Sequence, residues 1–166
     1  VFALTRKARE MFSYLRYPTK QQGLIWLRRR QRERPSEIAK DLKVSRPFVT
    51  MAQKTAEDRI LKLLQHTASV NRVKIERLST RYGIAKGYCA AYDTDTYIFY
   101  SPKIGLQLWY EHKRACGTCD MEDQCTKTLQ TLAEEWEIPL PEDRPPTELG
   151  VYLVDTIGRR LKWNQK

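Results

Sequence analysis

VKIERLSTRYGIAKGYCAAYDTDTYIFYSPKIGLQLWYEH, residues 73–112, is rich in tyrosine, isoleucine and valine, and turn residues interrupt it at intervals. Because β-branched and aromatic side chains favour pleated backbone, this pattern predicts strands over 73–78, 84–92, 96–101 and 106–112. The turns between them fall at 81–83, 93–95 and 102–105. Such short connections join neighbouring strands, so we expect an antiparallel meander.

Helical periodicity replaces this pattern on both sides of the meander. Apolar residues at helical spacing predict helices over 4–17, 20–33, 35–42 and 46–67, and again over 126–137 and 147–160. A proline-rich, acidic linker at 139–146 separates the last two. The chain is therefore predicted to be α+β. We expect an all-helical domain at 1–68, followed at 69–166 by an α+β domain that contains the meander and the C-terminal helices.

Positive charge is concentrated in the predicted helical domain. The whole chain has a net charge of +10, and residues 1–67 contain 16 Lys and Arg against 6 Asp and Glu. This asymmetry favours a polyanionic partner for the N-terminal part, although a solvated helix face would have the same composition. Apolar runs are far shorter than the roughly 20 residues of a membrane span. With no apolar leader at the start, the sequence predicts a cytoplasmic protein.

Residues 37–50, EIAKDLKVSRPFVT, have the pattern of two short helices joined by a tight turn. Ala39 is small where the helices would cross, Val44 and Val49 would fill the space between them, and Ser45 can cap the second helix. The pattern, continued to residue 58, resembles the helix-turn-helix of prokaryotic transcription regulators. It is similar to the archaeal Tfx group, to LuxR proteins and to region four of sigma factors. Lys43 is a departure, because these families usually have glycine there.

The resemblance implies a sequence-specific transcription regulator that binds double-stranded DNA. The second helix would enter the major groove. Its side chains able to reach base edges are Arg46, Thr50, Gln53 and Lys54, and candidates for phosphate contact are Ser45, Arg28, Arg29 and Arg30. The whole basic run 28–34 shares this predicted role, and the alternative is that it is only a solvated helix end.

The second helix also has an apolar stripe, which we call the core stripe: Val49, Ala52, Ala56, Ile60, Leu63 and Leu64. A stripe of this kind packs either as ordinary core or as the seam between two chains. Because regulators that bind two half-sites are usually two-fold dimers, we expect a homodimer.

Four cysteines are candidate ligands of an inorganic centre. Cys116, Cys119 and Cys125, the loop cysteines, form a C-x2-C-x5-C pattern in a polar segment, and Cys89 lies upstream in a strand-like run. Thiolates suit both zinc and iron–sulfur clusters. All four would hold a [4Fe–4S] cluster, and this spacing resembles the cluster staple of RecB-type iron–sulfur nucleases. Alternatively, His112 would replace Cys89 in a zinc site, with Cys89 a buried thiol.

These observations predict an archaeal-type, cytoplasmic, dimeric regulator whose [4Fe–4S] cluster would sense redox state, oxygen or iron. Loss of the cluster would free the loop and the helix at 126–137, and so change DNA binding. One alternative is a regulator with structural zinc, and another is an iron–sulfur enzyme that processes nucleic acid. The sequence contains no Ser-His-Asp, P-loop or dinucleotide-binding pattern, and it lacks the nuclease carboxylate and lysine signature, so we expect no enzymatic activity.

Overall fold

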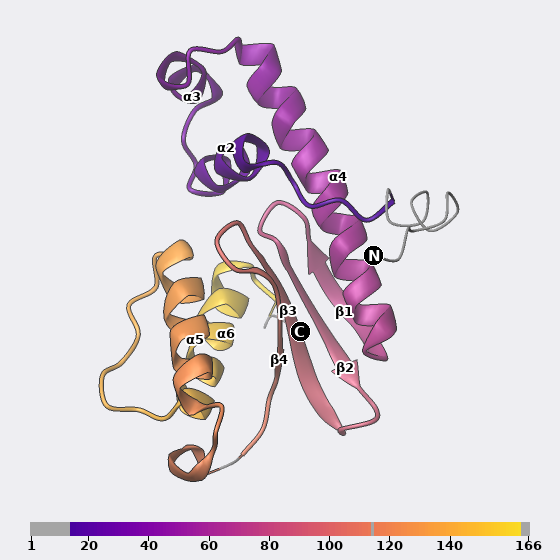
Figure 1. Ribbon diagram of the computed structural model, residues 1–166, viewed down its shortest axis with the longest axis vertical. Coiled ribbons are helices and arrows are strands. Elements are labelled where there is room, and N and C mark those ends of the chain that lie inside the picture. Colours follow the sequence, from indigo (N-terminus) through magenta and orange to yellow (C-terminus); the bar gives the residue numbers. More distant parts are fainter. Residues whose placement is uncertain (1–13, 114, 164–166) are drawn as a thin grey trace, which may run out of the picture.

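The computed structural model describes residues 14–113 and 115–163 and has an α+β fold, as predicted (Figure 1). Its α-helices are α2 (Lys20–Arg30), α3 (Pro35–Asp41), α4 (Arg46–Val70), α5 (Glu122–Glu135) and α6 (Pro146–Arg160), with a short 3-10 helix, η1 (Cys116–Thr118). Its strands are β1 (Val73–Ser79), β2 (Ile84–Cys89), β3 (Thr94–Ser101) and β4 (Gly105–Tyr110). The predicted helix at 4–17 lies almost entirely outside the described residues.

The four strands form one antiparallel sheet in the order β1-β2-β3-β4, which confirms the predicted meander. α4 lies against one face of the sheet, and α5 and α6 lie against the other (Figure 1). Because side chains alternate along a strand, the part of a central strand that is covered on both faces has apolar side chains on both sides. In β3, Tyr97 and Phe99 pack towards α5 and α6, whereas Ile98 and Tyr100 pack towards α4.

α4 is the longest element, with 25 residues, and it joins the two halves of the molecule. Every residue of the core stripe is buried: Val49, Ala52, Ala56, Ile60, Leu63 and Leu64. Val49 and Ala52 pack with residues of α2 and α3, and Ala56, Ile60 and Leu64 pack with residues of the sheet. The stripe is therefore core within one chain, and the dimer seam predicted from it is wrong. The predicted division at residue 68 falls inside α4.

Several boundaries differ from the prediction by a few residues, and two of these differences have a local reason. α5 begins at Glu122 rather than at residue 126, and Glu122 and Asp123 in its first turn favour a helix start because the N-terminal end of a helix is partly positive. β2 ends at Cys89 rather than at residue 92, because the chain turns there with Asp93 at φ 50°. The earlier start of α5 places Cys125 on a helix, where a loop was expected. None of the helices described is both long and apolar enough to cross a membrane.

Candidate functional site

The segment that resembles a helix-turn-helix forms α3, a tight turn and the first turns of α4. The N–H of Val44 donates to the carbonyl of Ala39 at 3.0 Å, closing the turn behind α3. Ala39 and Val49 are buried, as predicted, in a cluster with Ile25 of α2 and Ile38, and Val44 packs against this cluster. Lys43 has φ 53°, which is the left-handed region that glycine adopts most readily. The lysine therefore adopts the backbone conformation that the expected glycine would supply.

α4 starts with a defined cap and presents a polar, exposed side to solvent. The hydroxyl of Ser45 accepts a hydrogen bond from the N–H of Phe48 at 3.2 Å, so Ser45 is the N-cap of α4. Arg46, Thr50 and Lys54 are exposed and follow one another at a spacing of four residues, so they lie on one side of α4. We call these three residues the exposed stripe. The Thr50 hydroxyl donates to the Arg46 carbonyl at 3.3 Å.

Gln53, which was predicted to contact bases, is held by neighbouring side chains. Its Oε1 accepts from Nε of Arg29 at 2.9 Å, and its Nε2 donates to Glu57 at 2.9 Å. Arg29 also donates to the carbonyl of Glu33 at 2.5 Å. Both ends of the Gln53 amide are therefore occupied within the protein, and the amide connects α4 to α2.

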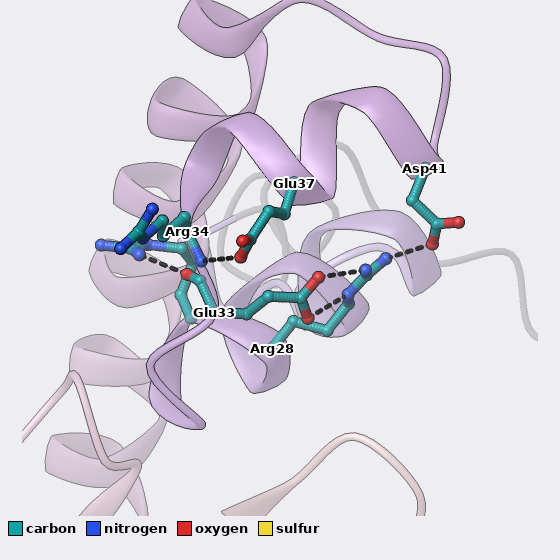
Figure 2. Close-up of polar contacts among 6 residues, drawn as sticks. Arg28, Glu33, Arg34, Glu37 and Asp41 are labelled. Carbon is teal, nitrogen blue, oxygen red and sulfur yellow. Dashed lines mark hydrogen bonds and ion pairs between the residues drawn. The ribbon is translucent and has the colours of Figure 1, made fainter.

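Arg28 occupies the corner between α2 and α3 (Figure 2). Its guanidinium forms a two-pronged contact with the Glu33 carboxylate, with Nε at 2.7 Å from Oε2. A third nitrogen lies 2.7 Å from Asp41 at the end of α3. The hydrogen bonds to Glu33 and Asp41 raise the pKa of Arg28 above its ordinary value. Arg28 thus links α2 to the turn that follows it and to the end of α3.

Arg30 points into the molecule, away from the surface where a phosphate would bind. It is 6% exposed, and its guanidinium lies 5.0 Å from the ring of Trp26 and 4.7 Å from the ring of Trp136. It donates to the carbonyl of Tyr82 at 3.3 Å and to the carbonyl of Glu135. Burial lowers the pKa of Arg30 to about 10. A phosphate contact would require Arg30 to leave this site.

The structure thus gives Arg28, Arg29 and Arg30 partners inside the protein. Charge alone did not separate them from their exposed neighbours, because all lie in one basic run. The exposed basic residues of this region are Arg32, Arg34, Lys40, Lys43, Arg46 and Lys54. Helical spacing from the buried Trp26 was the available signal for Arg30, since residues four apart share a helix face.

The three loop cysteines line one small cavity, of about 20 Å³, which we call the cysteine cavity. Its other lining residues are Trp109, His112, Glu122, Pro146 and Thr147. Cys119 donates its N–H to the Cys116 carbonyl at 2.8 Å, which closes η1. The Sγ of Cys116 lies 3.6 Å from the Thr147 hydroxyl of α6. Burial raises the pKa of the Cys125 thiol, and the neighbouring Cys119 and Cys116 raise it further.

Cys89 is not brought to this cavity. It is fully buried on the α4 face of the sheet, where its Sγ donates to the Asn71 carbonyl at 3.8 Å. Trp109, which lines the cavity, packs on the opposite face with α5 and α6. The predicted set of four thiolates is therefore divided between the two faces of the sheet. Among the described residues, no three His, Cys, Asp or Glu side chains are already gathered so as to hold a metal ion.

Comparison of the chain with protein-family models, with curated proteins and with solved structures found no match. The exposed stripe of α4 and the cysteine cavity are the two features of the structure that bear on its function.

Proposed function

We propose that this protein binds double-stranded DNA in a sequence-specific manner and acts as a transcription regulator. The observation that carries the proposal is the exposed stripe at the start of α4. Arg46, Thr50 and Lys54 project from a helix that is capped by Ser45 and held at its other side by α2 and α3. A helix presented in this way fits the major groove, which is wide enough to admit it.

The electrostatics of this end of the molecule favour a polyanion. The N-terminal end of a helix is partly positive, and the first turn of α4 contains no acidic residue that would offset it. Arg34, Lys40 and Lys43 are exposed nearby on α3 and its flanking turns. These residues are better placed to contact phosphates than Arg28, Arg29 and Arg30, which would first have to break bonds to partners within the protein.

Each residue of the exposed stripe has a specific chemistry to offer. A guanidinium such as that of Arg46 can donate two hydrogen bonds to the O6 and N7 atoms of guanine. The methyl group of Thr50 can contact the methyl group of thymine, while its hydroxyl stays on the helix backbone. Gln53, held by Arg29 and Glu57, sets the position of α4 on α2 and does not contact bases in this proposal.

We do not extend the proposal to an iron–sulfur sensor or to a nucleic-acid-processing enzyme. The four-cysteine cluster depends on Cys89, which is buried on the face of the sheet away from the cysteine cavity. Nor do we extend it to a homodimer, because the core stripe is buried within the chain.

The test is a binding selection followed by matched variants. The full chain is used to select preferred sites from a pool of randomised duplexes, and the affinity for the best site is measured by fluorescence anisotropy at several salt concentrations. Arg46→Ala is expected to weaken specific binding by ~1–3 kcal/mol. Lys74→Ala removes the same charge from an exposed position on β1 and is expected to leave affinity unchanged.

Two outcomes would reject this assignment. Selection that yields no preferred duplex would leave only non-specific attraction of a basic protein. Equal losses in Arg46→Ala and Lys74→Ala would show that affinity follows net charge and that the exposed stripe does not face the bases.

A further inference from the structure

We propose that the three loop cysteines and His112 bind one zinc ion in the cysteine cavity. This proposal is independent of DNA binding. It rests on the convergence of side chains from three places: the segment just after β4, the helix η1 with its C-cap residue, and the first turn of α5. His112, Cys116, Cys119 and Cys125 come from these places and all line the same cavity.

The hydrogen bond of His112 identifies the nitrogen that is available for a metal. Nδ1 of His112 lies 2.7 Å from the carbonyl oxygen of Tyr110. A carbonyl can only accept, so Nδ1 must carry the proton, and in the neutral ring Nε2 then has a free lone pair. Histidine ligands of metals are usually held in this way, with the other ring nitrogen donating to a carbonyl or a carboxylate. The ring is therefore in the tautomer that a metal ligand requires.

The donor set determines the class of metal. Three thiolates and one imidazole suit zinc, which takes four such ligands in tetrahedral structural sites, whereas calcium and magnesium require oxygen ligands. Among the described residues that line the cavity, Glu122 has the only carboxylate, and its oxygens could compete for the ion. A fourth ligand from His112 leaves Glu122 outside the coordination shell.

The size of the cavity favours a single ion over a cluster. A volume of about 20 Å³ is close to that needed by one water molecule, so a single ion requires far less opening of the loop than four irons and four sulfides would. As they stand, the side chains are not gathered closely enough to hold an ion, so binding would draw the thiols inward. Since the ligands come together only in the folded chain, zinc would add its binding energy to the stability of the loop and the start of α5.

The first experiment measures metal directly. The full chain is purified in the presence of zinc, and its zinc, iron and acid-labile sulfide are determined. We expect one zinc per chain and neither iron nor sulfide. The zinc-free protein is then titrated with Co²⁺ under reducing conditions. We expect thiolate-to-cobalt absorption and the visible bands of a tetrahedral site, saturating at one equivalent.

Variants then assign the ligands. Cys119→Ser and Cys125→Ser are expected to abolish stoichiometric binding of Co²⁺, and His112→Ala is expected to weaken it at least about 10-fold. Two matched controls should keep full occupancy: Cys89→Ser, which removes a thiol outside the cavity, and Glu122→Gln, which removes the competing oxygen donor. Circular dichroism of each variant separates loss of a ligand from loss of the fold.

Three results would overturn the proposal. Iron with sulfide in the purified protein would replace zinc by a cluster. Failure of the folded wild type to take up Co²⁺ would remove the site altogether, and this measurement does not depend on whether any variant folds. Loss of metal in a folded Cys89→Ser or Glu122→Gln variant, with retention in His112→Ala, would reject His112 as the fourth ligand.

Discussion

Lys43 shows how a single residue can depart from a pattern while the backbone keeps to it. Its φ of 53° is costly for any residue with a Cβ atom. Lys43→Gly is expected to raise the free energy of unfolding by about 0.5 kcal/mol, because relief of this strain exceeds the added entropy of the unfolded chain. Urea denaturation measures the change. Lys40→Gly, inside α3, should lower stability by about 1 kcal/mol, as glycine does in helix interiors. A destabilised Lys43→Gly variant would contradict the left-handed turn.

Arg28 and Arg34 provide a second comparison at the scale of residues. Arg28 bonds two carboxylates at the corner of α2 and α3 (Figure 2). The side chain of Arg34 is exposed, and Arg34 bonds Glu37 through its backbone. Arg28→Ala is expected to lower the free energy of unfolding by about 1 kcal/mol, the upper end of the range for ion pairs that water screens. Arg34→Ala should change it by less than about 0.5 kcal/mol. Equal losses of stability for the two variants in urea denaturation would show that the bonds of Arg28 to Glu33 and Asp41 do not stabilise the fold.

At the scale of elements, α6 packs closely on Trp109 of β4 at a position where it has a glycine, Gly150. A Cβ atom added to Gly150 would lie 2.3 Å from Cζ2 of Trp109. Glycine-to-alanine changes inside helices normally stabilise by about 1 kcal/mol. Gly150→Ala is instead expected to lower the free energy of unfolding by ~1–3 kcal/mol, because the tryptophan ring must move.

Gly117 is the matched control for this change. A Cβ atom there would meet no described atom within 4 Å, so Gly117→Ala should leave the melting temperature nearly unchanged. If thermal unfolding shows that Gly150→Ala stabilises the protein, α6 does not approach Trp109 as closely as described.

Helices and strands with a regular spacing of apolar residues could be predicted from the sequence. The residues at which they begin and end were harder to predict. The strands follow from dense β-branched and aromatic residues, and the start of α4 follows from Ser45 and Pro47. The fate of the core stripe was not decided by its period, since a buried stripe and a dimer seam share the same spacing. What decided it was the sheet, which packs against residues such as Ile60 and Leu64 and lies later in the chain.

At the scale of the whole molecule, Arg30 links parts of the chain that are far apart in sequence. It joins α2 to the turn at Tyr82 and to the end of α5 at Glu135. Arg30→Ala is expected to lower the free energy of unfolding by about 3 kcal/mol, through lost cation–π contacts and carbonyls left without a donor. Denaturation followed by both circular dichroism and tryptophan fluorescence measures the loss.

Arg32→Ala is the control, because Arg32 is exposed two residues along the same basic run. It should change stability by less than about 0.5 kcal/mol. In the wild type the two signals should coincide, since the helical part and the sheet share one core. Separate transitions would mean that the two parts unfold independently.

At the candidate sites, too, the sequence did not determine which residues distant along the chain would lie together. The spacing of the loop cysteines predicted that they would lie together, and they do line one cavity. Cys89 was assigned to the same set because a strand beside the loop could reach it, but the face that a strand residue takes depends on the register of the whole sheet. Arg30 was likewise assigned to the surface, because Trp136, its partner, lies more than a hundred residues later.

The continuity of α4 has a geometric consequence. Twenty-five helical residues span about 37 Å, and one uninterrupted rod carries the exposed stripe at one end and lies against the sheet along much of its length. No hinge separates the two, so the stripe cannot tilt or swivel unless the sheet turns with it. A partner bound to the exposed stripe would therefore have one fixed orientation relative to the sheet. The same edge of the sheet would always face the partner's same end.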